Sequence, residues 1–276
     1  MPQSIEDHLE GFIHHAIQFI AMIGQAYVPP MEDDSHTNMC WHIDQKAYMG
    51  HRVEGPLPFR AAFYPEEMSL HLLDDEDVSR VIIRLSQLSP SEVLDSLRKR
   101  LTAIGYEGEK LQEIKHYEIP AEPLASIGHF VLPSPGATQQ WALYRSEAQK
   151  GIEAIASAKG YQSMVQTWPH HFDAGIFEKF EIPEQEGGLG IGLGFAVKDT
   201  VANEPYFYVY LWQEKGSIDY TQLPPLTFGH WADGDWKGAY LGVSEVFTRG
   251  GAVWQHKIQT FLEEAHDQLI AVVGGQ

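Results

Sequence analysis

Residues 188–197 alternate glycine or alanine with a large apolar residue without interruption. Neighbouring side chains of a strand point to opposite faces, so this alternation predicts a β-strand rather than a helix. One face then faces a core, and the opposite face has no side chain larger than a methyl group. The core face consists of Leu189, Ile191, Leu193, Phe195 and Val197, and the bare face of Gly188, Gly190, Gly192, Gly194 and Ala196.

The next segment, 205–212, alternates in the same way and is expected to pair with the glycine strand. Its apolar side is Phe207, Val209 and Leu211, and its aromatic side is Tyr206, Tyr208, Tyr210 and Trp212. If residues 199–204 form a hairpin loop, matching the two core faces places the glycines beside the aromatic side chains. Either the rings or a helix backbone simply packs on the glycines, or Gly190 and Gly192 belong to a shallow floor on which a small molecule stacks.

The first half of the chain predicts a mixture of helices and strands. We expect a helix that ends before Val28, strands at 38–49, 57–64 and 68–73, a helix from Asp74 or Asp75 to about Leu88, a second helix to about Gly105, and a strand at 114–119. Ser89, Pro90 and Glu92 have the spacing of a capping box with proline in the first turn, and so mark the start of that second helix.

The second half repeats this order. We expect a helix at 139–159, strands at 164–168, 170–180, 188–197 and 205–212, a looped region, and a helix at 253–272. The sequence therefore predicts an α+β fold of two related halves, 1–120 and 136–276, joined by a proline-rich linker at 121–135. Their antiparallel strands would form one sheet or two packed sheets.

Each half contains a His-x-Asp pair, His42/Asp44 and His171/Asp173, which a strand would place on one face. A turn at Pro65-Glu66 would set Arg60 across from His71 on the same side as His42. A carboxylate can orient an imidazole as a general base or join it as a metal ligand. Such pairs also occur as ordinary cross-strand hydrogen bonds or solvated pairs.

Searches for specific cofactor and nucleophile motifs return nothing. The sequence has no His-Glu-x-x-His, clustered cysteines, EF-hand loop or Gly-x-Ser-x-Gly, so the metal, the cofactor and the question of enzymatic activity stay unassigned. Asp233-Gly234-Asp235 is expected to form a turn.

Charge and targeting features exclude some classes of partner. A net charge of −19 repels nucleic-acid phosphates and anionic membrane surfaces, so we expect neither as a partner. The acidic N-terminus does not resemble a secretory signal, and the apolar segment 11–28 is interrupted by polar residues. With the single cysteine Cys40, these features predict a cytoplasmic protein, whose oligomeric state the sequence does not give.

Several short motifs of the second half resemble a broad bacterial family that is classified as a domain of unknown function. They are Phe172-Asp173, Tyr206-Phe207-Tyr208, the segment 236–241, and Phe261-Leu262 with Ala265 in the last helix. Where that family has tryptophan, glycine and serine before Phe-Asp, this chain has Pro169-His170-His171. The resemblance implies an α+β fold and brings no established activity.

Three functional hypotheses follow. The first is binding of a small, partly planar molecule at a face built from Tyr206, Tyr208, Tyr210, Trp212, His171 and Asp173. The second is a hydrolase or isomerase, metal-dependent or not, that uses His171/Asp173 and His42/Asp44. The third is an acidic module that binds a basic partner protein.

Overall fold

The computed structural model describes residues 8–181, 187–248 and 253–274. Residues 1–7, on which the expectation of a missing secretory signal rests, lie outside this range. The chain divides into two compact units. Unit 1 comprises the residues up to Leu143 together with Thr167–Phe172, and unit 2 comprises Tyr144–Gln166 and Asp173–Gln276. The division lies inside a long helix, α4 (Pro135–Lys159), so the segment expected as a linker belongs to unit 1.

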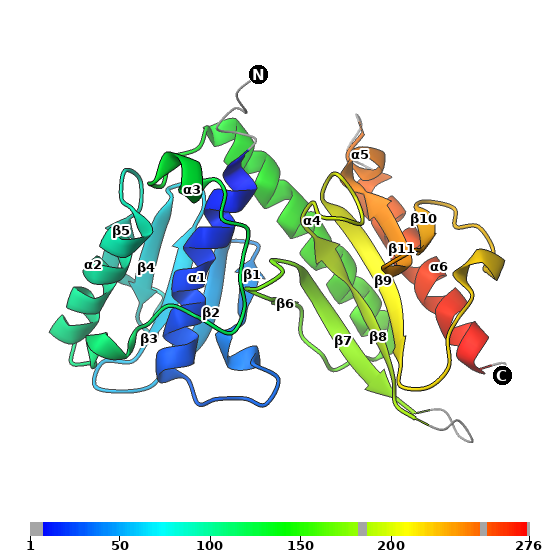
Figure 1. Ribbon diagram of the computed structural model, residues 1–276, viewed down its shortest axis with the longest axis horizontal. Coiled ribbons are helices and arrows are strands. Elements are labelled where there is room, and N and C mark those ends of the chain that lie inside the picture. The colour runs from blue at the N-terminus through cyan, green and yellow to red at the C-terminus, as the bar shows by residue number, and fades with distance from the viewer. Residues whose placement is uncertain (1–7, 182–186, 249–252, 275–276) are drawn as a thin grey trace. The chain divides into compact units, whose positions relative to one another are not determined.

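Unit 1 packs an antiparallel sheet against helices (Figure 1). Its elements are α1 (Leu9–Tyr27), η2 (Ser35–Thr37), β1 (Met39–His42), β2 (Ala47–Val53), β3 (Phe59–Tyr64), β4 (Ser69–Leu73), β5 (Ser79–Arg84), α2 (Pro90–Ala103), η3 (Gly108–Lys110) and α3 (Leu124–Ile127). The strand order is β1-β2-β3-β4-β5, and Thr167, the last residue of β6 (Gln166–Thr167), pairs with Met39 at the β1 edge. α1 packs on β2 and β3, and Phe59 and Phe63 of β3 are buried.

Three predicted elements of unit 1 are wrong. The expected strand 38–49 is two strands, β1 and β2, joined by a turn at 43–46. The segment expected to form a helix from Asp74 forms a turn and strand β5 instead. The Asp74 carboxylate accepts the N–H groups of Glu76 and Val78 and closes the turn, so that the chain returns along β4. Residues 114–119 are irregular.

The start of α2 follows the prediction from its sequence. The Ser89 side chain accepts the Glu92 N–H, and the Glu92 carboxylate accepts the Ser89 N–H at 2.8 Å, so both halves of the capping box form. Pro90 occupies the first turn, where a missing N–H costs nothing. Local chemistry therefore fixed this boundary.

The strands of unit 2 are antiparallel as well. Its elements are the C-terminal part of α4, Gln166 of β6, β7 (Ala174–Phe180), β8 (Leu189–Ala196), β9 (Tyr206–Gln213), η4 (Tyr220–Gln222), β10 (His230–Asp233), β11 (Lys237–Gly242), α5 (Val243–Val246) and α6 (Trp254–Gly274). Five of these strands follow the order β7-β8-β9-β11-β10. Side chains of α4 and α6 join the core on one face of this sheet, with Ile152 and Phe261 fully buried. The expected looped region contains the β10–β11 hairpin, with the predicted Asp-Gly-Asp turn between the strands.

The predicted register between the glycine and aromatic strands is confirmed. Gly190 pairs with Trp212, Gly192 with Tyr210, and Gly194 with Tyr208. The mixed α+β class is confirmed as well, while the relation of the two halves by duplication stays a prediction. Within the described residues, no helix has the length and apolar character needed to cross a membrane.

Candidate functional site

Four aromatic side chains cover the glycines of β8 on the sheet face opposite the α4 and α6 core. We call these side chains, Phe177, Tyr208, Tyr210 and Trp212, the aromatic platform. A Cβ atom on Gly192 would lie 2.2 Å from Cε1 of Tyr210, and one on Gly190 would lie 2.3 Å from Cζ of Phe177. These distances are far below van der Waals contact. The rings of the platform therefore occupy the space above the strand that any larger residue would fill.

The rings of the platform form a continuous series. Phe177 and Tyr210 are stacked with an interplanar angle of 19° and a centroid distance of 6.2 Å, and Tyr210 lies 6.0 Å from Tyr208. Phe177 also meets Trp212 edge-on at 6.4 Å. The Trp212 residue is 43% exposed, and the other three are half-buried. A molecule from solvent can thus reach one large ring and the margins of three others.

Two carboxylates accept hydrogen bonds from Tyr208 of the platform and from the adjacent Tyr206. The Tyr208 hydroxyl donates to Asp173 Oδ2 at 2.6 Å, and the Tyr206 hydroxyl donates to Asp199 Oδ2 at 2.8 Å. Burial and the nearby carboxylates raise the pKa of both tyrosines far above the usual value. Both phenols therefore remain protonated and uncharged at physiological pH. This face can stack on a ligand and offer hydrogen bonds.

His171 and Asp173 do not occupy a common strand, so their predicted strand geometry is wrong. Phe172 between them has a positive φ of 58°, its N–H donates to the Trp168 carbonyl at 2.8 Å, and β7 begins only at Ala174. His171 lies at the end of unit 1, is exposed, and has its ring centroid 4.3 Å from that of His170. Asp173 belongs to unit 2.

His42 and Asp44 are likewise not neighbours on one strand face. β1 ends at His42, and Asp44 is exposed in the following turn. Burial lowers the pKa of His42, the Arg60 charge lowers it further, and Asp77 opposes both. The carboxylate that acts on this imidazole is thus Asp77, from the β4–β5 turn, rather than the predicted Asp44.

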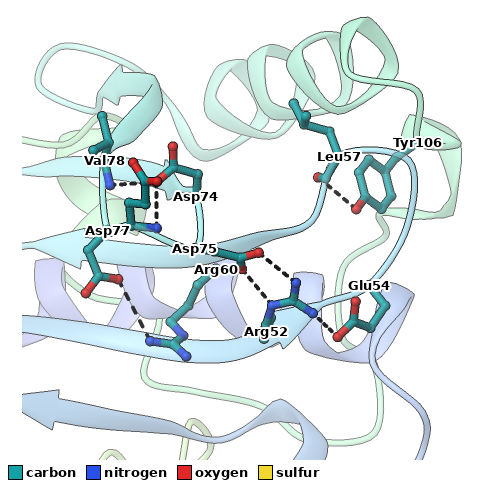
Figure 2. A network of polar contacts seen from close by, with 10 residues as sticks. Arg52, Glu54, Leu57, Arg60, Asp74, Asp75, Asp77, Val78 and Tyr106 are labelled. Carbon is teal, nitrogen blue, oxygen red and sulfur yellow. Dashed lines mark hydrogen bonds and ion pairs between the residues drawn. The ribbon is translucent and has the colours of Figure 1, made fainter.

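Arg60 lies in a network of charged side chains at the edge of unit 1 (Figure 2). Its Nη1 is 4.0 Å from Asp77 Oδ1. Next to it, Arg52 donates to both oxygens of Asp75, at 2.7 and 2.9 Å, and also pairs with Glu54. Asp75 and Asp77 are not expected beside these arginines from the sequence, because both belong to the β4–β5 turn, where the sequence predicts a helix.

His71 is a buried histidine whose two ring nitrogens are both hydrogen-bonded. Its Nε2 lies 2.8 Å from Ser69 Oγ and its Nδ1 lies 2.8 Å from Ser79 Oγ. Its strand partner is Ala62, whereas Arg60 pairs with Leu73, so the predicted Arg60–His71 opposition is wrong by two residues. The cause is a wider turn than Pro65-Glu66 alone, because the strands pair only up to Tyr64 and Ser69.

Sequence reasoning missed a cavity in unit 1, where residues 113–119 cross α1. Its polar lining includes His15, Gln18 and Tyr117. The sequence predicts a strand at 114–119, and a strand there gives no reason to expect a cavity. Gln18 and Tyr117 lie far apart in sequence, so no motif connects them.

Neither metal-ligand geometry nor comparison with known proteins assigns a function. Within residues 8–181, 187–248 and 253–274, no group of three or more histidine, cysteine, aspartate or glutamate side chains is arranged to hold a metal ion. A scan of family models and searches of curated proteins and of solved structures found no significant match to this chain.

Proposed function

We propose that unit 2 binds a small molecule with a flat face, which stacks on the aromatic platform. The observation that carries this proposal is the placement of Phe177, Tyr208 and Tyr210 across the glycines of β8. The glycines allow these rings to lie low over the sheet, with the exposed ring of Trp212 at one end. Aromatic stacking of this kind contributes about 0.5–1.5 kcal/mol per ring pair beyond the burial of area.

The polar groups beside the platform would orient such a ligand. Tyr208 is engaged by Asp173, and Tyr210 has a pKa raised by burial and by the Asp173 charge. The Tyr210 hydroxyl is thus a neutral group that can donate or accept. The chain carries a net charge of −19, which favours a neutral or cationic ligand over an anionic one.

The proposal is tested with coumarin, a neutral planar probe, by saturation-transfer NMR and calorimetric titration. Trp212→Ala removes the exposed ring and is expected to weaken coumarin binding by about tenfold, since one lost stacking contact is about 1.4 kcal/mol. Met164→Ala is the matched control, because Met164 is an exposed apolar side chain of the same unit outside the platform.

Equal affinities for the Trp212→Ala, Met164→Ala and wild-type proteins would refute the platform as the binding site. The absence of coumarin binding to the wild-type protein would refute a general stacking surface. Gly192→Leu supplies a second check, because a leucine there must displace the Tyr210 ring and should reduce binding if the protein stays folded.

A further inference from the structure

An irregular segment of unit 1, residues 111–119, is fixed at both ends across helices α1 and α2 (Figure 1). At its start, Arg98 of α2 donates through Nε and Nη2 to the Leu111 carbonyl, at 3.0 and 2.8 Å. Near its end, the Tyr117 hydroxyl donates to Gln18 Oε1 of α1 at 2.8 Å, and His116 Nε2 lies 3.0 Å from Asp34 Oδ2. The segment is therefore held in place by three separate polar anchors.

Between this segment and the two helices lies a cavity of about 200 Å³. A cavity of about 150 Å³ in another protein holds benzene, so this volume admits a six-membered ring with a short substituent. Phe19, Met22 and Leu94 belong to its apolar lining, and Gln18, Glu113 and Tyr117 to its polar lining. Most of the lining residues are apolar, and the polar ones are few and convergent, as in small-molecule sites.

The Gln18 amide shows which hydrogen-bonding roles remain in the cavity. Its Nε2 donates to the His14 and Pro169 carbonyls at 3.1 and 2.8 Å, which turns Oε1 toward Tyr117. The Tyr117 hydroxyl donates its proton to that oxygen. Burial raises the pKa of this tyrosine, so the hydroxyl stays protonated. What Tyr117 can still offer a ligand is a lone pair.

His15 lines the cavity as a neutral ring. Burial lowers its pKa, which keeps the imidazole neutral, while the carbonyls of Pro120, Ala121 and Glu122 lie close enough to act on the ring. Its Nε2 is buried and has no hydrogen-bond partner. Because that atom is closed off from the cavity, His15 contributes an uncharged ring surface to the lining.

We propose that this cavity binds a small apolar amine in its ammonium form, with an aromatic or aliphatic ring as the apolar body. The body fits among Phe19, Met22 and Leu94. The ammonium group has three donors and no acceptor, which complements the free lone pair of Tyr117 and the exposed carboxylate of Glu113. The negative charge of the whole chain raises the local concentration of cations and adds to this preference.

The test is a calorimetric titration at pH 7 with three probes of nearly equal shape: benzylamine, benzyl alcohol and benzoate. We expect benzylamine to bind about tenfold more tightly than benzyl alcohol, because charge-assisted hydrogen bonds are about twice as strong as neutral ones. Benzoate should bind more weakly than either. Glu113→Gln should reduce benzylamine affinity severalfold without affecting benzyl alcohol.

Glu109→Gln is the matched control for Glu113→Gln. It removes the same charge from an exposed carboxylate that does not line the cavity, and should leave benzylamine affinity unchanged. Equal losses in the two variants would show general charge attraction and overturn the proposal. Equal binding of benzylamine and benzyl alcohol, or no binding of benzylamine, would overturn it as well.

A further variant separates this site from the platform of unit 2. Trp212→Ala should leave benzylamine affinity unchanged, and Leu94→Trp, which fills the cavity, should abolish it while coumarin binding persists. Loss of benzylamine binding in Trp212→Ala would assign the amine to the platform and overturn the cavity proposal. Far-ultraviolet circular dichroism establishes that each variant is folded.

Discussion

At the scale of the residue, the glycines of β8 are required by the rings beside them rather than by backbone conformation. Gly190 and Gly192 lie in regular strand and pair normally with β9. The space above Gly192 is filled by Tyr210, whose ring would be 2.2 Å from an added Cβ. A single methyl group is thus enough to push the ring away from the sheet.

Gly192→Ala is therefore expected to lower the free energy of unfolding by about 1–3 kcal/mol, the usual cost of overpacking. Urea denaturation measures this change. In a Tyr210→Ala background the same substitution should cost much less, because the displaced ring is gone. Gly136→Ala, in the first turn of α4 with no atom near the new Cβ, is the control and should not destabilise the protein. Additive losses in the double variant would contradict this account.

At the scale of the element, α2 and β5 show two different origins of secondary structure. α2 begins where its own Ser89-Pro90-x-Glu92 sequence directs it. Residues 79–84 have no comparable start signal, and they form a strand because β4 offers a paired edge to them. A local cap can be identified in a sequence, whereas an available strand edge exists only after the rest of the sheet has formed.

For α2, Ser89→Ala should lower the free energy of unfolding by about 1 kcal/mol, the usual cost of losing a serine N-cap. The Ser89 hydroxyl accepts the Glu92 N–H, and alanine leaves that donor without its cap. Ser96→Ala in the interior of the same helix is the control and should be neutral or slightly stabilising. The urea midpoints of unfolding of the two variants test this prediction. Equal midpoints would mean that the cap contributes nothing to the free energy of unfolding.

At the scale of the whole molecule, buried histidines make the free energy of unfolding depend on pH. Burial lowers the pKa of His14 to about 4, and the neighbouring His15, His170 and His171 lower it too. His14 is stacked on Phe172, and its Nε2 lies 2.9 Å from the Pro169 carbonyl oxygen. The unfolded chain binds a proton at this residue near pH 6.5, whereas the folded chain does so only near pH 4.

Between these two values the unfolded state holds more protons, so stability falls as the pH is lowered from about 6.5 toward 4. By pH 5, His14 alone lowers the free energy of unfolding by roughly 2 kcal/mol. We therefore expect His14→Gln to lose less free energy of unfolding than the wild type between pH 7 and pH 5. His256→Gln, at an exposed position of α6, should retain the wild-type slope. A wild-type slope in His14→Gln would refute the role of His14.

The sequence by itself determined the features that depend on near neighbours in the chain. The β8–β9 register followed from two alternating segments joined by a short loop, and the start of α2 followed from its capping box. Only the tertiary structure decided that rings cover the glycines, that the carboxylate whose charge acts on His42 is Asp77 rather than Asp44, and that Gln18 is bonded to Tyr117. These interactions join residues from separate elements, and their geometry depends on turn widths and packing that no local pattern encodes.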